Sequence, residues 1–275
     1  MAHPFSLVDV FASGPLSGNP LAVVFDADDL RDAEMQAFAR WMNLSETTFL
    51  LGPTSLEADY RVRIFTPGGE LPFAGHPTLG TCHAWLEAGG KPRHPDVILQ
   101  ECGVGRVRVR ASDDRLAFAA PPMTSSVLDP DLQRRLLGAL HLEPSQVVAS
   151  RWLDNGSKWA ALLLSDVDVL LALEPDHAAL KTLVKVGLIA PRPKGDPFAF
   201  EVRAFAAAAG IPEDPVTGSL NAALAQWLED KAPGDYGVSQ GTCLQRAGHI
   251  CVERRGGDVW IGGRTITTGR GELSL

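Results

Sequence analysis

The amino-acid sequence predicts an α+β protein with two similarly folded halves, each made mainly of strands around one tryptophan-bearing helix. An internal repeat supports this prediction, because VRIF at residues 62–65 returns as VRAF at 202–205, 140 residues later. Downstream, a Gly-His pair precedes AWLE at 84–87 and a Gly-Ser pair precedes QWLE at 226–229, at an offset of 142 residues. Since the matches keep their order, they indicate two copies of one structural unit.

The composition is that of an ordinary globular protein. The chain has 275 residues, of which 45% are hydrophobic and 21% charged, with a net charge of −8 at pH 7. This length fits about two domains. No cluster of basic residues suits nucleic acid or an anionic membrane, and no apolar run approaches about 20 residues. We therefore expect no nucleic acid and no membrane as partner, and the lack of an N-terminal targeting pattern predicts a cytoplasmic protein.

Strands and helices alternate through the first half. A helix is expected from Asp28 to about Trp41, because apolar residues recur there at helical spacing. A Pro/Gly loop at 66–70 precedes a second helix, which starts near Gly75. The strands are recognised by β-branched and apolar runs or by alternation with period two. They are expected at 5–11, 21–25, 47–51, 60–65, 96–100, 105–110 and 116–118.

The second half repeats this plan, with a Pro-Pro pair at 121–122 as the predicted boundary. We expect strands at 160–164 and 198–205, a helix around 176–183, and then a glycine turn, a helix and two terminal strands. The predicted domains are residues 1–120 and 121–263. We expect the C-terminal tail, about 264–275, to pack back onto the first half, and we expect the active site in the cleft between the halves.

Two glycine turns open the tryptophan-bearing helices. Gly75 allows a close approach of the backbone to a ligand, Pro77 suits the first helical position, and His76 then falls at the N-cap. The partner helix begins in the same way at residues 217–219. Two helix N-termini in one cleft would offer free N–H groups and partial positive charge to a small carboxylate. The alternative is two ordinary caps, but recurrence at the same point of both halves favours a shared site.

Three polar residues near these turns are candidates for proton transfer or binding. Glu46 stands where a short connection enters an apolar strand, and burial there would raise its pKa. A solvated surface residue is the alternative. Asp214 precedes the second turn and could orient His76 or act as a second acid/base, but an Asp before Pro215 is also common turn chemistry. Ser219 could bind a carboxylate or cap its helix.

Motifs for other chemistries are missing from the sequence. The chain has no C-x-x-C pair, and reduced thiols are expected. No H-x-x-x-H or H-E-x-x-H pair predicts a metal site, and neither a P-loop nor a G-x-G-x-x-G turn predicts a nucleotide. We therefore expect neither metal nor cofactor. The four cysteines are Cys82, Cys102, Cys243 and Cys251.

Five further motifs lie in a fixed order along the chain. They are FASGPLSGNPLAV at 11–23, LSETTF at 44–49, ELPFAGHPTLG at 70–80, EDPVTGS at 213–219 and QGTCLQR at 240–246. Together they resemble the PhzF-like family of phenazine-biosynthesis isomerases over essentially the whole chain. The resemblance implies a diaminopimelate-epimerase-like fold. That fold has two pseudo-symmetric halves, each a β-barrel-like mixed sheet wrapped around a central helix, with the site between them.

The resemblance also implies residue roles and an activity. The activity would be a cofactor-independent isomerisation of a dihydro-hydroxyanthranilate-like carboxylic acid, in which Glu46 takes a proton from one carbon and returns one to another. The chain would work as a homodimer. Catalytic roles fall on Glu46, His76 and Asp214, and binding of the substrate on Gly75, Thr217, Gly218 and Ser219.

Two alternatives are weighed against this activity. Related amino-acid epimerases carry a cysteine at each glycine turn, whereas Cys82 lies about two helical turns beyond Gly75, so a two-cysteine racemase is excluded. A non-catalytic binding or scaffold protein of the same fold would be free to lose any of the polar site residues. The presence of Glu46, His76, Asp214 and Ser219 together favours an enzyme.

Overall fold

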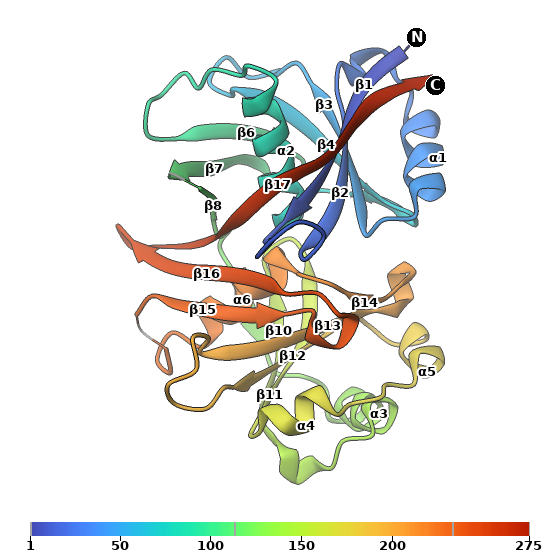
Figure 1. Cartoon of the computed structure of the whole chain (residues 1–275). Coiled ribbons are helices and arrows are strands. Elements are labelled where there is room, and N and C mark those ends of the chain that lie inside the picture. Colours follow the sequence, from blue (N-terminus) through green and yellow to red (C-terminus); the bar gives the residue numbers. More distant parts are fainter. Residues whose placement is uncertain (1, 113, 233, 275) are drawn as a thin grey trace.

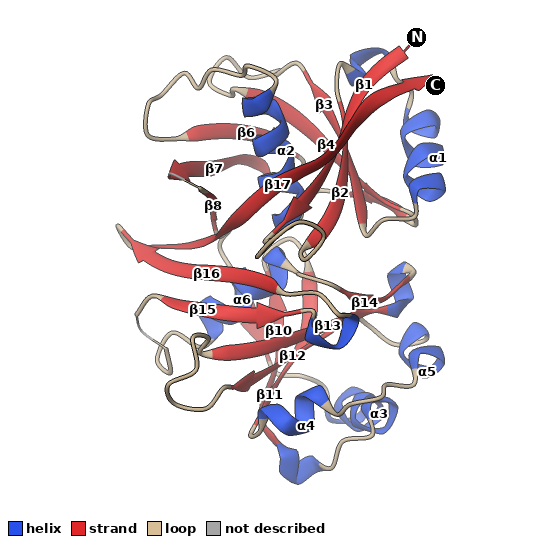
Figure 2. Ribbon diagram, in the orientation of Figure 1, coloured by secondary structure: helices blue, strands red, loops and turns tan. Residues whose placement is uncertain are grey.

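Two lobes lie one above the other in the computed structural model, which describes residues 2–112, 114–232 and 234–274 (Figure 1). Strands form most of both lobes, and η denotes a 3₁₀ helix (Figure 2). The first lobe contains β1 (Ala2–Val10), β2 (Asn19–Val24), η1 (Ala27–Asp29), α1 (Asp32–Met42), β3 (Glu46–Leu51), β4 (Tyr60–Thr66), β5 (Gly69–Leu71), α2 (Gly75–Glu87), β6 (Ile98–Cys102), β7 (Gly105–Ser112) and β8 (Arg115–Ala119).

The second lobe follows the same plan with additional helices. Its elements are β9 (Thr124–Ser126), α3 (Pro130–Leu140), η2 (Pro144–Gln146), β10 (Val147–Asp154), β11 (Lys158–Leu164), α4 (Val167–Leu171), α5 (His177–Lys181), β12 (Val186–Pro191), β13 (Phe200–Ala206), η3 (Ala207–Ala209), β14 (Ile211–Asp214), α6 (Gly218–Trp227), β15 (Tyr236–Gln240), η4 (Thr242–Leu244), β16 (Gly248–Arg255) and β17 (Asp258–Ser274).

Strand pairing confirms the predicted pseudo-symmetry. In the first lobe the ladder runs β1-β2-β3-β4-β6-β7-β8-β17 and closes from β17 back onto β1. In the second lobe it runs β10-β11-β12-β13-β15-β16-β17, with β9 beside β10. Parallel pairs stand at corresponding places, β2 with β3 and β4 with β6 in one lobe, β11 with β12 and β13 with β15 in the other. The fold therefore consists of two barrel-like mixed sheets with corresponding strand orders.

The longest strand, β17, belongs to both lobes. Residues 258–262 pair with β16 and residues 260–264 with β8, after which residues 265–274 pair with β1. In Figure 1 this red ribbon crosses from one lobe to the other. Conversely, the chain leaves β8 in the first lobe and continues into β9, which pairs with β10. The first lobe is thus closed by a strand that continues from the second, and the second lobe receives β9 at the edge of its sheet from the chain that leaves the first.

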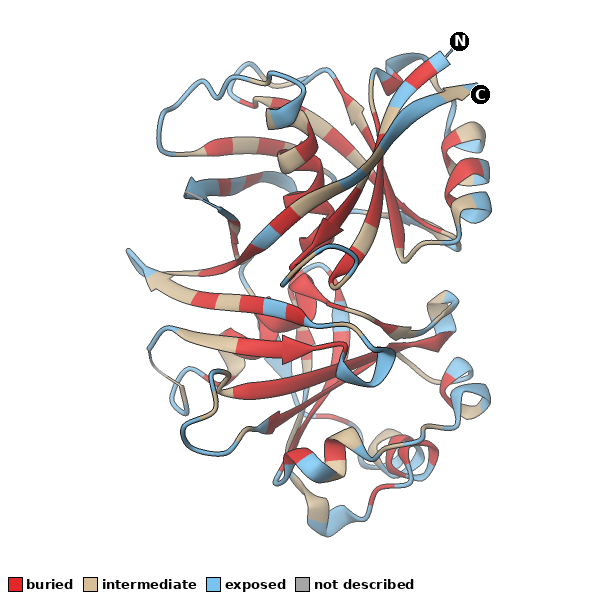
Figure 3. Ribbon diagram, in the orientation of Figure 1, coloured by how far each residue is buried: buried red, intermediate tan, exposed pale blue. Residues whose placement is uncertain are grey.

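Helices α2 and α6 are enclosed by the two sheets, as the red ribbons of Figure 3 show. Residues 75–82 of α2 and 218–225 of α6 are all buried. A helix that is surrounded by strands needs apolar or small residues on every side, and the glycines, alanines and threonines here meet that need. The central hydrophobic cluster includes residues of both lobes, for example Val8 and Leu220.

The outer helices cover the other face of the sheets. In the first lobe Met35 and Phe38 of α1 pack on Phe49 and Phe65. In the second lobe α3, α4 and α5 cover β11, β12 and β13 in a separate cluster. None of the helices in the described part of the chain is long and apolar enough to cross a membrane.

Several predicted boundaries in the first lobe are corrected by the structure. The helix expected from Asp28 begins at Asp32, because Arg31 is extended and donates its N–H to the carboxylate of Glu34. Residues 27–29 form only the short turn η1. The loop expected at 66–70 is a tight hairpin, in which the hydroxyl of Thr66 bonds the turn and β5 pairs back onto β4.

In the second lobe the sequence prediction missed β9, α3, β10, α4, β12 and β14. A signal for α3 was present, since Asp129 accepts hydrogen bonds from the backbone of the first turn and Pro130 starts the helix. The helix expected around 176–183 shortens to α5, with Asp176 as its N-cap. Three terminal strands, β15, β16 and β17, replace the two expected.

Candidate active site

The two central helices begin in contact with each other. A Cβ placed on Gly75 would lie 2.7 Å from the carbonyl carbon of Gly218 and 2.8 Å from its Cα. In the opposite direction, a Cβ on Gly218 would lie 3.0 Å from the Gly75 backbone. Only glycine fits such an approach at both positions. The repeat therefore brings its two glycine turns together at the junction of the lobes.

The assignment of His76 as N-cap was wrong by two residues, and the capping alternative for Ser219 does not hold either. Helix α2 has Ala74 as its N-cap, so His76 is the second helical residue and Pro77 the third. Helix α6 has Thr217 as its N-cap, and Ser219 is its second residue. Neither N-cap side chain accepts a hydrogen bond from its helix. His76 and Ser219 are thus buried first-turn side chains and not caps.

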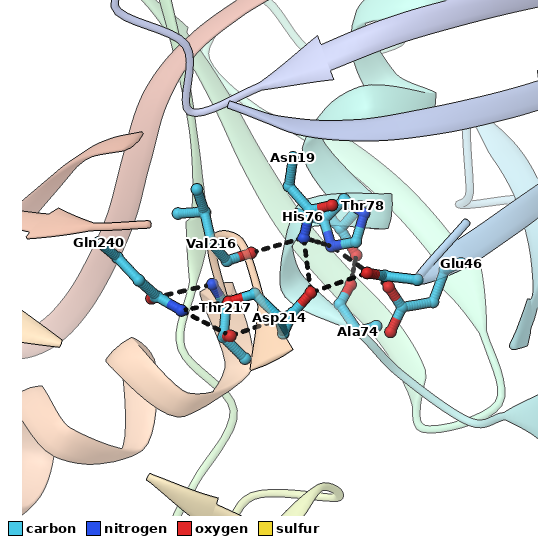
Figure 4. A network of polar contacts seen from close by, with 10 residues as sticks. Asn19, Glu46, Ala74, His76, Thr78, Asp214, Val216, Thr217 and Gln240 are labelled. Atoms are coloured by element: carbon cyan, nitrogen blue, oxygen red, sulfur yellow. Dashed lines mark hydrogen bonds and ion pairs between the residues drawn. The ribbon is translucent and has the colours of Figure 1, made fainter. Parts of the chain in front are cut away.

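Asp214 stands at the end of β14 and joins the two lobes (Figure 4). Its Oδ1 accepts hydrogen bonds from Asn19 Nδ2 at 2.8 Å and from Ser45 Oγ at 2.9 Å. Its Oδ2 accepts one from Thr217 Oγ1 at 2.6 Å. Three donors on a buried carboxyl stabilise its ionised form.

His76 lies beside the Glu46 carboxyl and is separated from Asp214 by Asn19. Its Nδ1 is 3.4 Å from Glu46 Oε2 and 3.4 Å from Asn19 Nδ2. Asn19 stands between His76 and Asp214, so the predicted orientation of His76 by Asp214 is indirect (Figure 4). Burial lowers the pKa of His76 to about 3. At neutral pH the ring is therefore uncharged, and one of its nitrogens can donate while the other accepts.

Glu46 is the first residue of β3, and it is not the solvated surface residue that local sequence also allowed. Its exposed fraction is 9%, against 7% for Asp214 and 2% for His76. Burial, and next the negative charge of Asp214, raise the pKa of the Glu46 carboxyl well above its ordinary value, against the opposing effect of Lys185. Burial also raises the pKa of Asp214, but hydrogen bonds from Thr217, Ser45 and Asn19 oppose it. The pair therefore favours a neutral Glu46 beside an ionised Asp214.

Buried polar atoms with no hydrogen-bond partner among the described residues gather at this point. They include Oε2 of Glu46, Nε2 of His76 and Oδ1 of Asn19. Such groups are rare in folded proteins and are expected where a ligand supplies the missing partner. The seven residues predicted from the sequence lie at or beside this cluster, since Gly75 adjoins His76 and residues 217–219 start α6.

The sequence analysis missed four contributors to the site. Asn19 lies in the motif at 11–23 and Gln240 in the motif at 240–246, but neither was given a role, and Ser45 directly precedes Glu46. Lys185 had no local signal, yet its charge acts on both Glu46 and Asp214. The Lys185 ammonium donates to Ser157 Oγ at 2.6 Å and lies 4.7 Å from the ring centre of Trp159. This cation reaches the site only because β11 and β12 lie side by side.

The described residues do not place a reactive thiol at the site. Cys82 is fully buried two turns into α2, and burial raises its pKa to about 12. All four cysteines are free. Among residues 2–112, 114–232 and 234–274, no three His, Cys, Asp or Glu side chains group as metal ligands would. A buried carboxyl group with a raised pKa, as at Glu46, is of the kind that can exchange a proton with a bound molecule.

Comparison with known families identifies relatives over the full length. The model of a family described as "Phenazine biosynthesis-like protein" matches residues 8–271. The chain is 35% identical over 285 residues to trans-2,3-dihydro-3-hydroxyanthranilate isomerase of Pseudomonas fluorescens, covering 99% of this chain and 100% of the relative. It is 38% identical over 261 residues to antisense-enhancing sequence 1 of Schizosaccharomyces pombe, covering 89% and 88%.

Solved structures agree with the predicted fold class. A phenazine biosynthesis protein of the PhzF family from Bacillus anthracis superposes with a TM-score of 0.86, 22% identity and coverage of 100% of both chains. A hydroxyproline epimerase from Agrobacterium vitis superposes with a TM-score of 0.68, 16% identity and coverage of 100% of this chain and 93% of that one. At these identities the likeness establishes the fold alone.

Proposed function

Because the chain belongs to the phenazine biosynthesis-like protein family, we propose that it is an isomerase that moves a proton on a small carboxylic acid. The relatives named trans-2,3-dihydro-3-hydroxyanthranilate isomerase suggest the substrate class. The observation that supports this best is the carboxyl pair. Glu46 has a raised pKa and an Oε2 with no hydrogen-bond partner among the described residues, beside an Asp214 held by three donors.

In the proposed reaction Glu46 acts first as base and then as acid. The base is the ionised fraction of Glu46, which the raised pKa makes the minor form, and it takes a proton from one carbon of the substrate. The same raised pKa then favours the protonated carboxyl until the proton is delivered. The same oxygen delivers the proton to a second carbon of the conjugated system on the same face. No redox change occurs, so the proposed isomerisation needs no cofactor. Asp214 stays ionised and positions the groups around it.

His76 and the helix starts would hold the substrate. A ring with a pKa of about 3 stays neutral, so His76 can share a hydrogen bond with a polar substituent without competing for the transferred proton. We place the substrate carboxylate near the first turns of α2 and α6, at Gly75 and residues 217–219, with the field of Lys185 nearby. First-turn N–H groups bind anions well. This is how a chain of net charge −8 could hold an anionic molecule.

Replacement of Glu46 by glutamine tests the proposal, with trans-2,3-dihydro-3-hydroxyanthranilate as probe. Glutamine keeps the shape but cannot accept a proton, so kcat should fall by about 10² or more while the Kd of the substrate changes little. In deuterated water the wild-type product should carry deuterium at the reprotonated carbon. Replacement of all four cysteines by serine is the control and should leave turnover within about tenfold, because no thiol takes part.

Two outcomes would count against the proposal. Near-normal turnover by Glu46→Gln would move the role to Asp214 or His76. A wild-type protein that binds carboxylic acids of this class but exchanges none of their protons with deuterated water would indicate a non-catalytic binding or scaffold protein. We also propose, from the family resemblance, that residues 1–120 and 121–263 act as two domains and that the chain works as a cytoplasmic homodimer. Light scattering of the purified protein can test the oligomeric state.

A further inference from the structure

Two glutamines at corresponding places in the repeat make different contacts. Gln100 of β6 and Gln240 of β15 are both fully buried. Each bonds the third residue after the glycine of its helix, since Gln100 Nε2 donates to Thr78 Oγ1 at 2.9 Å and Asn221 Nδ2 donates to Gln240 Oε1 at 2.9 Å. The Tyr60 hydroxyl also donates to Gln100 Oε1, at 3.1 Å. Gln240, in contrast, bonds the segment that carries Asp214.

The orientation of the Gln240 amide is fixed by two backbone groups. Its Oε1 accepts from the Thr217 N–H at 3.0 Å, and its Nε2 donates to the Asp214 carbonyl oxygen at 3.1 Å. A flipped amide would oppose donor to donor and acceptor to acceptor at these two contacts. The group that faces Thr217 Oγ1 at 2.9 Å is therefore the NH₂, which donates.

This orientation determines where the hydroxyl hydrogen of Thr217 points. Because Thr217 Oγ1 accepts from Gln240, its single hydrogen is free for Asp214 Oδ2, which lies 2.6 Å away. The other oxygen, Oδ1, faces a second fixed amide, since Asn19 Nδ2 also donates to the Val216 carbonyl at 2.9 Å. Both oxygens of Asp214 are thus placed to accept hydrogen bonds.

We infer that Gln240 is a positioning residue, which turns the Thr217 hydroxyl toward Asp214 and so keeps that carboxyl ionised, leaving Glu46 to carry the proton. The role of Glu46 as proton carrier rests on the proposed function. The hydrogen bonds among Gln240, Thr217 and Asp214 do not depend on it. The charged or titratable groups that face Asp214 are Glu46 and His76 from the first lobe and Lys185 from the second. Gln240 adds no charge to this set and acts only through hydrogen-bond direction.

A double-mutant cycle on the pKa of Asp214 tests the inference without any substrate. The readout is the ¹³C NMR titration of its carboxyl carbon, identified by its loss in Asp214→Asn. Gln240→Met removes the amide at similar length and should raise this pKa by about one pH unit, as expected when a hydrogen bond to a charged group weakens. Thr217→Val should raise it at least as far. In the Thr217→Val background, Gln240→Met should then add little.

Matched variants separate this role from a structural one. Thr217→Ser keeps the hydroxyl and should retain the full effect of Gln240→Met. Gln100→Met removes the corresponding amide from the first lobe and should lower stability without changing the pKa of Asp214. The inference would be overturned if Gln240→Met shifted the pKa of Asp214 equally in the wild-type and the Thr217→Val backgrounds. If Gln240→Met does not fold, an unchanged pKa in Thr217→Val alone would overturn it.

Turnover distinguishes this inference from the proposed function. With the dihydro-hydroxyanthranilate probe, Gln240→Met should lower kcat about tenfold with little change in KM, because Gln240 is fully buried and its amide bonds protein groups at Thr217, Asn221 and Asp214. If the wild type does not convert the probe but the cycle behaves as expected, the proposed substrate is wrong and the positioning role stands. If the wild type converts the probe but the two pKa shifts of the cycle are additive, the proposed isomerase activity stands and the positioning role of Gln240 is wrong.

Discussion

The burial of Glu46 has opposite consequences for activity and for stability. The folded chain keeps the Glu46 proton at pH values where the unfolded chain has released it, since burial raises the pKa above the ordinary 4.5. The folded state then binds more protons than the unfolded state, so stability falls as pH rises above about 4.5. The residue that we propose to transfer the proton thereby costs stability at neutral pH, as functional sites often do.

We predict that Glu46→Gln is more stable than the wild type at pH 7 although it is catalytically impaired. The difference in the free energy of unfolding should be small near pH 4 and grow by up to about 1.4 kcal/mol for each pH unit above that, until the raised pKa is reached. Urea denaturation at pH 4, 5, 6 and 7 measures it. The exposed Glu174→Gln should stay within about 0.5 kcal/mol of the wild type. A destabilised Glu46→Gln at pH 7 would contradict the burial argument.

Among the elements, α2 and α6 depend on each other at their first residues. Gly75 touches the Gly218 backbone, and the side chain of His76, which follows Gly75, lies 3.4 Å from Glu46 and from Asn19. A displacement of either helix start would therefore move His76 relative to Asp214. Because the contact is between backbones, no rotation of a side chain can relieve an added methyl group.

We predict that Gly75→Ala lowers the free energy of unfolding by about 1–3 kcal/mol and also lowers turnover. The reason is the 2.7 Å approach of the new Cβ to Gly218. Gly138→Ala is the matched control in helix α3, where nothing lies within 4 Å of the added Cβ, and it should stabilise by about 0.5–1 kcal/mol. Thermal and urea unfolding compare the two. Equal stability of Gly75→Ala and wild type would mean that the helix starts can separate freely.

The whole molecule is joined by the strands that the lobes share. Residues 265–274 of β17 close the first barrel on β1, while residues 258–264 of the same strand lie between β16 and β8. The C-terminal segment therefore stabilises the N-terminal lobe, although the two are distant in sequence. Its removal would expose the backbone N–H and C=O groups along one side of β1.

We predict that a chain ending at Arg264 loses amide protection in the first lobe before the second. Hydrogen exchange followed by mass spectrometry should show faster exchange in β1 and β2, because their barrel is opened. Strands β11, β12 and β13 should keep their protection, since their partners remain. Uniform loss of protection across both lobes would show that the lobes unfold as one unit, and unchanged protection in β1 would show that β17 is dispensable.

The sequence by itself determined the features that neighbouring residues encode. The repeat around VRIF and VRAF predicted two similar lobes, because matches that keep their order indicate two copies of one unit. Gly75 and Gly218 predicted the two helix starts, because start signals act within about ten residues of chain. Period-two alternation located β4, and apolar β-branched runs located β3. Helix α3 was missed although Asp129 and Pro130 are ordinary start signals, and the N-caps were misplaced because Ala74 caps with an extended backbone and no side-chain signal.

The tertiary structure alone decided how the site is assembled. Asp214 and Asn19 lie 195 residues apart in sequence and 2.8 Å apart in space, and no local pattern links them. Lys185 reaches the carboxyl pair only through the packing of β12 beside β11. The donor direction of Thr217 follows from the contacts of Gln240 with two backbone groups. These properties depend on distance and burial, which a sequence encodes only through the complete fold. Helices and strands, in contrast, follow from residues close to one another in the chain, and the repeat can be read by comparing the sequence with itself.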